Sequence, residues 1–333
     1  MYRIGIDFGG TNIAVGIVNE KLEVLYKSSL PTKKDERSVD EMVEDMATLC
    51  LKMVDKTGIT LDKVSSIGIA SPGVVNSKIG VVEYYCGMNM VHYPMAAILS
   101  EKLGGFEPIY MENDANAAAL GEVLAGAARG ADNALMITLG TGVGGGIVID
   151  GKIYDGFNFA AAELGHTVIE KDGVPCNCGR RGCWEKYSSA TGLIRMTKEE
   201  MEKCPDSEMW KIAPTLEEVD GKTSYDAAKA GDEAAKRVVA KYQDYLATGL
   251  ANMVNIFQPE VLCIGGGVCG QGDNLLIPVN EQVMKEQYAR TSKNKTKLVI
   301  ATLGNNAGIV GAAALGMSLN EETDKETDEQ TAE

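Results

Sequence analysis

The sequence is short of basic residues. Its 333 residues include 32 Lys and Arg against 47 Asp and Glu, which gives a formal net charge of −15. Binding to nucleic acid needs clustered Lys and Arg, so this shortage argues against a nucleic-acid partner. An anionic small substrate stays open, because backbone N–H groups and a metal ion can hold phosphate. Part of the acidity lies at residues 319–333, which we expect to form a disordered acidic tail.

Long apolar runs are also missing. No segment reaches the roughly 18 consecutive apolar residues of a membrane span, and Met1–Asp7 lacks the features of a signal peptide. We therefore expect a cytoplasmic protein with no membrane partner. The eight cysteines of such a chain are not expected to form a disulfide framework. Two of them, Cys204 and Cys269, fall in expected loops and receive no role.

Two familiar nucleotide motifs are absent or out of context. The sequence has no G-x-x-x-x-G-K-[ST], which excludes a P-loop. Gly140, Gly142 and Gly145 match the spacing G-x-G-x-x-G of dinucleotide-binding proteins. In those proteins the motif opens a helix, whereas residues 147–149 continue here as an expected strand. The sequence therefore argues against a Rossmann domain.

What the sequence does contain is the same strand–glycine–strand pattern twice. Apolar residues 2–7 lead into a turn at 8–12, and apolar residues 134–139 lead into glycines at 140–146. Each turn is followed by a second expected strand, which predicts two related halves facing a shared cleft. A further strand is expected at 22–26, and helices are expected at 233–257 and 310–315. Unshielded backbone N–H groups in such turns can bind phosphate, and Asp7 could hold Mg²⁺ directly or through water. Two ordinary β-turns are the alternative interpretation.

A second candidate is the pair Asn113 and Asp114. They lie where the short apolar stretch 108–111 meets an alanine-rich expected helix. A carboxylate there can accept a proton from a substrate hydroxyl, and the neighbouring amide can hydrogen-bond the substrate. Asn and Asp are also favoured as helix caps, so capping is the alternative role.

The third candidate is a cluster of metal-binding side chains. His166, Cys176, Cys178 and Cys183 make up one His and three Cys, in a chain that has only two histidines. This set is common in closed tetrahedral zinc sites. The spacing therefore predicts a zinc ion.

Together these motifs resemble the ROK family of bacterial glucokinases and related hexose kinases, within the actin-like sugar kinase superfamily. The resemblance covers about residues 3–317 and is carried by the glycine turns at 7–12 and 139–146, by Gly265–Gly267 and by the His–Cys cluster. It implies an α/β, actin-like ATPase (ribonuclease H-like) fold with two lobes and a central cleft. We expect a small lobe at 1–120 plus 304–318 and a large lobe at 121–303.

The resemblance also implies roles for individual residues, with ATP, Mg²⁺ and Zn²⁺ as cofactors. Asp114 would be the catalytic base. The residues expected to bind ATP are Asp7, Gly9, Gly10, Thr11, Asn12, Gly140, Thr141, Gly142, Gly265, Gly266 and Gly267. Those expected to contact the sugar are Gly73, Asn89, Asn113, Asp114, Glu163, His166 and Glu185.

The implied activity is ATP-dependent phosphorylation of a hexose, with glucose to glucose 6-phosphate preferred, by a homodimer. N-acetylmannosamine, N-acetylglucosamine and fructose kinases of the same family are the alternatives. A sugar-sensing transcriptional repressor would need a helix-turn-helix module, which we do not expect because the first strand begins at residue 2. A sugar-binding protein without catalytic activity is the remaining alternative.

Overall fold

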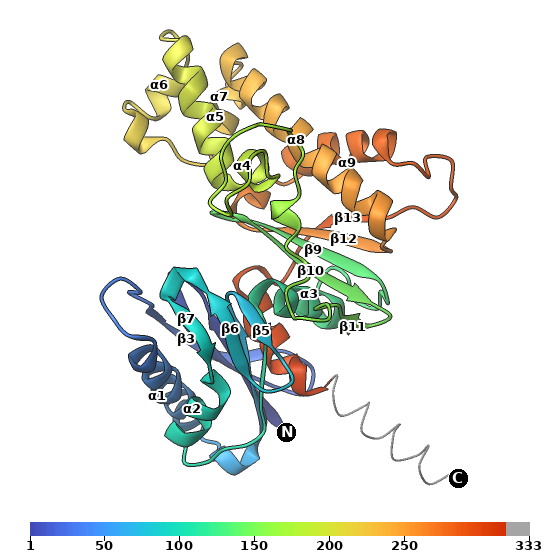
Figure 1. Cartoon of the computed structure of the whole chain (residues 1–333). Coiled ribbons are helices and arrows are strands. Elements are labelled where there is room, and N and C mark those ends of the chain that lie inside the picture. The colour runs from blue at the N-terminus through green and yellow to red at the C-terminus, as the bar shows by residue number, and fades with distance from the viewer. Residues whose placement is uncertain (318–333) are drawn as a thin grey trace. The chain divides into compact units, whose positions relative to one another are not determined.

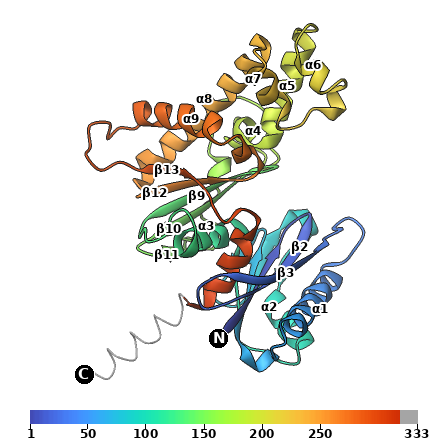
Figure 2. The same ribbon diagram turned by 180° about the vertical axis from the view of Figure 1, so that it is seen from behind.

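The structure is a computed structural model that describes residues 1–317. The chain divides into two compact units (Figures 1 and 2). The first unit comprises Met1–Asn133, Gly146–Ala162 and the chain from Thr302 onward, and the second comprises Ala134–Gly145 and Glu163–Ala301. The expected lobe boundary at residue 120 falls inside helix α3 (Asp114–Ala125), all of which belongs to the first unit. The expected acidic tail lies outside the described residues.

A five-stranded sheet forms the centre of the first unit, in the order β3-β2-β1-β4-β8. These strands are β1 (Tyr2–Phe8), β2 (Asn12–Val18), β3 (Val24–Pro31), β4 (Val64–Ser71) and β8 (Ile109–Asn113). β2 pairs antiparallel with β1 and β3, whereas β4 is parallel to β1 and to β8. Asp7 therefore pairs with Ala70, and Ser71 with Asn113, at one edge of the sheet. The carboxyl ends of three parallel strands thus carry the expected site residues Asp7 and Asn113.

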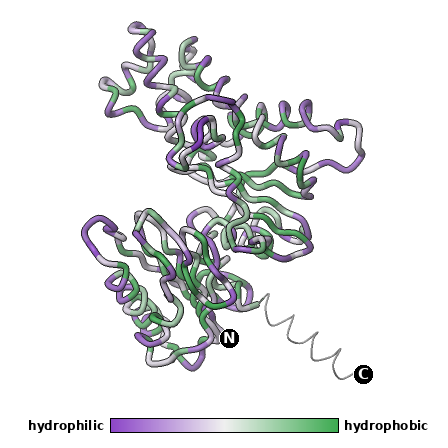
Figure 3. The backbone as a smooth tube through the Cα atoms, in the orientation of Figure 1, coloured by the Kyte–Doolittle hydropathy of each residue, from purple (hydrophilic) through white to green (hydrophobic). Residues whose placement is uncertain are grey.

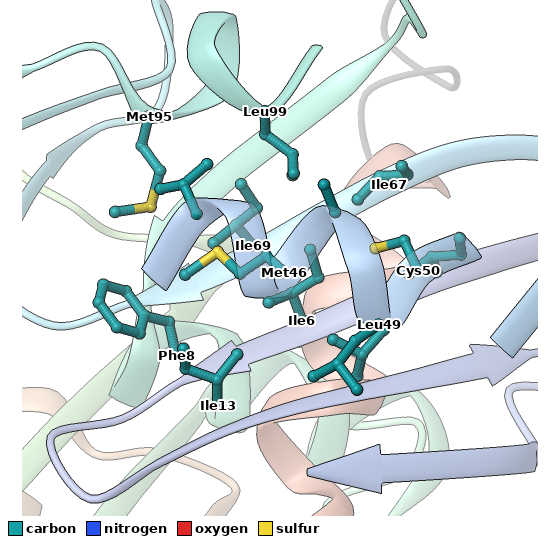
Figure 4. Close-up of a cluster of buried hydrophobic side chains, with 14 of the residues drawn as sticks. Ile6, Phe8, Ile13, Met46, Leu49, Cys50, Ile67, Ile69, Met95 and Leu99 are labelled. Carbon is teal, nitrogen blue, oxygen red and sulfur yellow. The ribbon is translucent and has the colours of Figure 1, made fainter. Parts of the chain in front are cut away.

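The main core of this unit lies between the sheet and helix α1 (Val39–Thr57). Ser38 and Glu41 form a capping box that starts the helix. Met42, Met46 and Met53 follow at helical spacing and are buried, so one face of α1 covers the sheet. Figure 3 shows α1 alternating between hydrophilic and hydrophobic residues. Figure 4 shows the resulting cluster, in which side chains from α1 lie among those from the sheet.

Glycines let the C-terminal helix, residues 307–317, lie almost in contact with the backbone of this sheet. A methyl group built on Gly5 would be 1.9 Å from the carbonyl oxygen of Ile309, and one on Gly68 would be 1.8 Å from that of Ala312. No larger residue fits at either position. This close packing joins the end of the described chain to its first unit, and the helix expected at 310–315 is confirmed.

The first unit also contains a small sheet and a helix next to the main core. Its strands are β5 (Val74–Asn76), β6 (Val81–Tyr85) and β7 (Met90–Tyr93), joined in antiparallel order, and α2 (Met95–Lys102) follows. One correction concerns β3. We expected this strand at 22–26, but it begins two residues later and continues to Pro31.

The second unit is a parallel sheet with mostly helical insertions. β12 (Val261–Gly265) lies between β9 (Ala134–Leu139) and β13 (Lys297–Ile300), parallel to both. β10 (Val143–Ile149) begins in this unit and ends in the first, where it pairs with β11 (Lys152–Ile153). The helices are α4 (Glu185–Ser188), α5 (Ala190–Lys203), α6 (Met209–Ile212), α7 (Thr223–Lys229), α8 (Glu233–Phe257) and α9 (Asp273–Glu286).

The two five-stranded sheets share one topology. The second has the order β11-β10-β9-β12-β13. If the strands of each sheet are numbered along the chain, both sheets have the spatial order third, second, first, fourth, fifth. The repeat that the glycine turns predicted is therefore confirmed. In the described part of the chain, no helix is both long and apolar enough to cross a membrane.

Candidate active site and metal centre

The first glycine turn, between β1 and β2, is held in place by hydrogen bonds from Thr32. Thr32 donates its hydroxyl proton to the carbonyl oxygen of Gly9 at 2.7 Å, and its backbone N–H to Thr11 at 2.8 Å. The backbone N–H of Gly9 donates across the turn to Asn12 at 2.9 Å. Gly10, Thr11 and Asn12 are exposed. The turn is therefore fixed in shape and presents its tip to solvent, as an anion-binding loop requires.

Asp7 carries a half-buried carboxylate. Burial raises its pKa to about 6, and no hydrogen bond to its side chain occurs within residues 1–317. A methyl group on Gly308 would lie 2.6 Å from one carboxylate oxygen, so the helix backbone closes over this side chain. A half-buried carboxylate with no hydrogen-bond donor among the described residues is a ligand that suits Mg²⁺. The residue present therefore fits the magnesium role expected for it.

Asn113 is a helix cap as well as an expected sugar contact. Its side-chain oxygen accepts hydrogen bonds from the backbone N–H of Ala115 at 2.9 Å and of Asn116 at 3.3 Å, which starts α3. Its amide nitrogen donates to the carbonyl oxygen of Gly73 at 3.1 Å. The capping alternative is thus confirmed, and the same bonds attach Gly73 to the start of the helix. Asp114 is the first residue of α3, and its carboxylate accepts from Ala115 at 2.9 Å.

Glu112, the residue before this pair, was given no role from the sequence. It is 4% exposed, and one carboxylate oxygen accepts from the backbone N–H of Asn113 at 2.8 Å and from the side chain of Asn116 at 3.0 Å. Burial raises the pKa of Glu112 to about 7. An acidic residue in an otherwise apolar strand was the available signal. Glu112 therefore holds the backbone of Asn113, next to Asp114, from the buried side.

Asn89 lies in the same unit, just after a single 3-10 turn at Cys86–Met88. Its φ of 52° is in the left-handed region, which Asn tolerates better than most residues. The side chain is exposed.

In the second unit the predicted zinc ligands do come together. The candidate ligand atoms of His166, Cys176, Cys178 and Cys183 all lie within 4.8 Å of one another. Nδ1 of His166 is 3.6 Å from the sulfur of Cys176, and the sulfurs of Cys178 and Cys183 are also 3.6 Å apart. A tetrahedron with Zn–S bonds near 2.3 Å has edges of roughly 3.8 Å. The four side chains therefore fit zinc, and the three cysteines form no disulfide.

Local backbone geometry explains why these residues meet. Cys176 donates its N–H to the carbonyl oxygen of Arg180 at 2.8 Å, and the chain turns through Gly179 at a φ of 87°. An isolated antiparallel bridge joins Val168 to Cys183. A hydrogen bond from the backbone of Arg180 lowers the pKa of Cys178, which favours its thiolate.

The three expected sugar contacts of this unit lie around the cluster. Nε2 of His166 is 3.9 Å from the carboxylate of Glu163, so the ring faces the cluster with one nitrogen and Glu163 with the other. One carboxylate oxygen of Glu185 is 3.9 Å from the sulfur of Cys176 and 3.6 Å from Nζ of Lys186. The other accepts from the backbone N–H of Val143 at 3.3 Å. Glu185 thus connects the cluster to the second glycine turn.

The second glycine turn and Gly265–Gly267 are neighbours in this unit. The turn is held by backbone hydrogen bonds from Gly140 to Gly142 and from Ala190 to Gly140, at 3.0 and 2.9 Å. Gly266 has a φ of 98°, and a methyl group there would be 2.4 Å from the carbonyl oxygen of Leu139, the residue before the turn. The expected phosphate and adenosine loops of this unit are therefore adjacent. The predicted site residues fall into two groups, one in each unit.

The chain is similar to known proteins over nearly its whole length. The ROK family model matches residues 3–318. The glucokinase of Thermotoga maritima is 37% identical over 314 residues, which cover 94% of this chain and 96% of that protein. The glucokinase of Halalkalibacterium halodurans is 36% identical over 94% of both.

Similarity in structure points the same way. A solved ROK family glucokinase from Streptomyces griseus, in complex with glucose and AMPPNP, has a TM-score of 0.81 and 32% identity, covering 95% of this chain and 99% of that one. The xylose repressor of Caldicellulosiruptor bescii is more distant, at 28% identity over 78% of its own length. The chain therefore belongs to the ROK family and has the actin-like ATPase fold of its sugar kinases.

Proposed function

We propose that this protein is an ATP-dependent hexokinase that converts glucose to glucose 6-phosphate. The observation that carries the proposal is Asp114, a carboxylate at the first position of α3, in a chain similar to glucokinases over 94% of its length. The reaction moves the γ-phosphoryl group of ATP to a sugar oxygen. The P–O bond to ADP breaks, a new P–O bond forms, and the hydroxyl proton leaves.

Asp114 is the proton acceptor in this mechanism. A sugar hydroxyl is a poor nucleophile at neutral pH, so a base that takes its proton as the phosphoryl group arrives accelerates the reaction. Asn113 supports this role through the cap, which fixes the first turn of α3 and leaves its amide one further N–H to donate. Glu112 holds the backbone of Asn113 from the buried side.

The glycine loops are proposed to hold ATP. Backbone N–H groups in the turns at Gly9–Asn12 and Gly140–Gly142, other than those of Gly9 and Gly140 themselves, would donate hydrogen bonds to the phosphates. Gly265–Gly267 would contact the adenosine. Asp7 would hold Mg²⁺, which offsets negative charge on the phosphates.

The remaining polar residues are proposed to bind the sugar. Gly73 and Asn89 in the first unit, and Glu163, His166 and Glu185 in the second, offer carbonyl, amide, carboxylate and imidazole groups to ring hydroxyls. Zinc on His166, Cys176, Cys178 and Cys183 would act as a structural ion that fixes the orientation of the His166 ring. A homodimer is proposed from the family resemblance, and the mass in solution measured by light scattering tests it.

A coupled assay of ADP release across several sugars tests the function. We expect kcat/KM to be higher for glucose than for N-acetylglucosamine, N-acetylmannosamine or fructose, because polar groups left unpaired by the wrong sugar reduce transition-state binding. A tenfold preference for an N-acetyl sugar would overturn glucose as substrate and leave the kinase class intact. No turnover with any sugar, together with sugar binding in calorimetry, would identify a non-catalytic sugar-binding protein.

A further inference from the structure

Tyr85 is held in one orientation by glycines. It is the last residue of β6, and its ring folds back over the chain that follows. A methyl group on Gly73 would be 2.6 Å from Cβ of Tyr85, and one on Gly87 would be 2.4 Å from its hydroxyl oxygen. Only residues without a side chain fit at these distances. The ring therefore lies between two glycines, one of which, Gly73, is bonded to the cap residue Asn113.

The hydroxyl group of Tyr85 lies next to the first glycine turn. A methyl group on Gly10 would be 3.9 Å from this oxygen, which is ordinary van der Waals contact. The hydroxyl has no hydrogen-bond partner among residues 1–317, although half-buried tyrosine hydroxyls usually find one. A rigid donor thus remains available beside the exposed tip of the turn.

The charge of Asp114 acts on this hydroxyl. Burial is the larger cause that raises the pKa of Tyr85, followed by the negative charge of the Asp114 carboxylate and by Cys86. All of these groups belong to the first unit. Tyr85 is therefore protonated at neutral pH, and its hydroxyl lies beside the proposed phosphate loop.

We propose that Tyr85 is a further catalytic residue, whose hydroxyl donates a hydrogen bond to the phosphoryl group as it passes from ATP to the sugar. The inference rests on the proposed kinase function. The phosphoryl group must move from the glycine turn toward the oxygen whose proton Asp114 accepts. The Tyr85 hydroxyl lies next to the turn, and the charge of the Asp114 carboxylate acts on it. A fixed donor is most effective on the oxygens of the transferring group, where negative charge is spread in the transition state.

The adjacent tyrosine provides a matched control. Tyr84 points to the opposite face of β6, is 56% exposed and pairs across the sheet with Val91. Tyr85→Phe and Tyr84→Phe each remove one hydroxyl and keep the ring, so both should fold and melt like the wild type.

We expect Tyr85→Phe to lower kcat by about 10²-fold, the lower end of the loss found when one transition-state donor is removed. The KM values for glucose and ATP should change by less than about threefold, because the bond forms mainly in the transition state. Binding of ADP with aluminium fluoride and glucose, which imitates the transferring group, should weaken by a similar factor. Binding of AMPPNP, and the kinetics of Tyr84→Phe, should not change.

Two results would overturn the inference. One is a kcat for Tyr85→Phe within about threefold of the wild type. The other is a raised KM for glucose at unchanged kcat, which would mean that the hydroxyl contacts the sugar instead. Both presuppose an active wild-type enzyme. An inactive wild type would refute the kinase proposal itself, so the two failures are distinguishable.

Discussion

Gly142 lies directly against the carboxylate of Glu185. A methyl group on this glycine would be 2.2 Å from Oε2 of Glu185, the oxygen that accepts the backbone N–H of Val143. The other oxygen of the same carboxylate approaches Cys176 in the predicted zinc cluster. One glycine of the second turn thus leaves room for an acidic side chain that links the turn, the proposed sugar contacts and the metal ligands.

This contact predicts the effect of Gly142→Ala. The new methyl group should displace Glu185 and break its bond to Val143, which is worth about 1.5–3 kcal/mol for a charged acceptor. We expect KM for glucose to rise about tenfold or more in steady-state kinetics. Gly221→Ala is the control, because a methyl group there has nothing within 4 Å. An unchanged glucose KM in Gly142→Ala would contradict the role given to Glu185.

Asp114→Asn tests the base. The amide keeps the shape of the carboxylate but cannot take the hydroxyl proton, so we expect kcat to fall by about 10²–10⁴, or roughly 3–5 kcal/mol of barrier. Glucose should still bind in calorimetry, because the amide can contact the hydroxyl. If kcat stays within about fivefold of the wild type, another group must accept the proton.

Removing one zinc ligand should lower metal content and stability together. Cys178 is the exposed member of the cluster, so Cys178→Ala creates little cavity and reports mainly on metal binding. We expect less than one zinc per chain by elemental analysis and a lower melting temperature, because metal binding contributes to folding free energy. Cys204→Ala, outside the cluster, should keep full zinc content. Full stability and activity in metal-free wild-type protein would show that zinc has no role.

Glu112 predicts a pH dependence of stability. Its pKa is raised from 4.5 to about 7 in the folded protein, so its contribution is fully present below pH 4.5 and is lost as pH rises through 7. Glu112→Gln keeps an oxygen for Asn113 and Asn116 but carries no charge. Compared with this variant, the wild type should lose up to about 3 kcal/mol of unfolding free energy between pH 5 and 8. Denaturant titrations at several pH values measure the free energy of unfolding of both proteins. An equal dependence on pH in the two proteins would show that no buried charge forms at Glu112.

The sequence by itself determined the features that depend on neighbours along the chain. The helix at 233–257 and the strand at 134–139 have the predicted bounds, because hydrophobic periodicity is local. The His–Cys cluster was predicted from its residue types and spacing. Its four side chains meet because of the turn at Gly179 and the bridge between Val168 and Cys183, which join segments close in sequence. β3 was misplaced because none of its residues is buried, so no apolar pattern marks its end.

Only the tertiary structure decided which distant residues share a site. Asp7 and Asn113 come to one edge of the sheet through the parallel pairing of β1, β4 and β8, which no local pattern specifies. The burial of Glu112 depends on the pairing of β8 with β4, and the orientation of Tyr85 depends on contact with Gly73 and Gly10. The burial and orientation of a side chain are set by atoms that folding brings near from distant parts of the chain. Burial and orientation in turn decide the pKa and reactivity of that side chain.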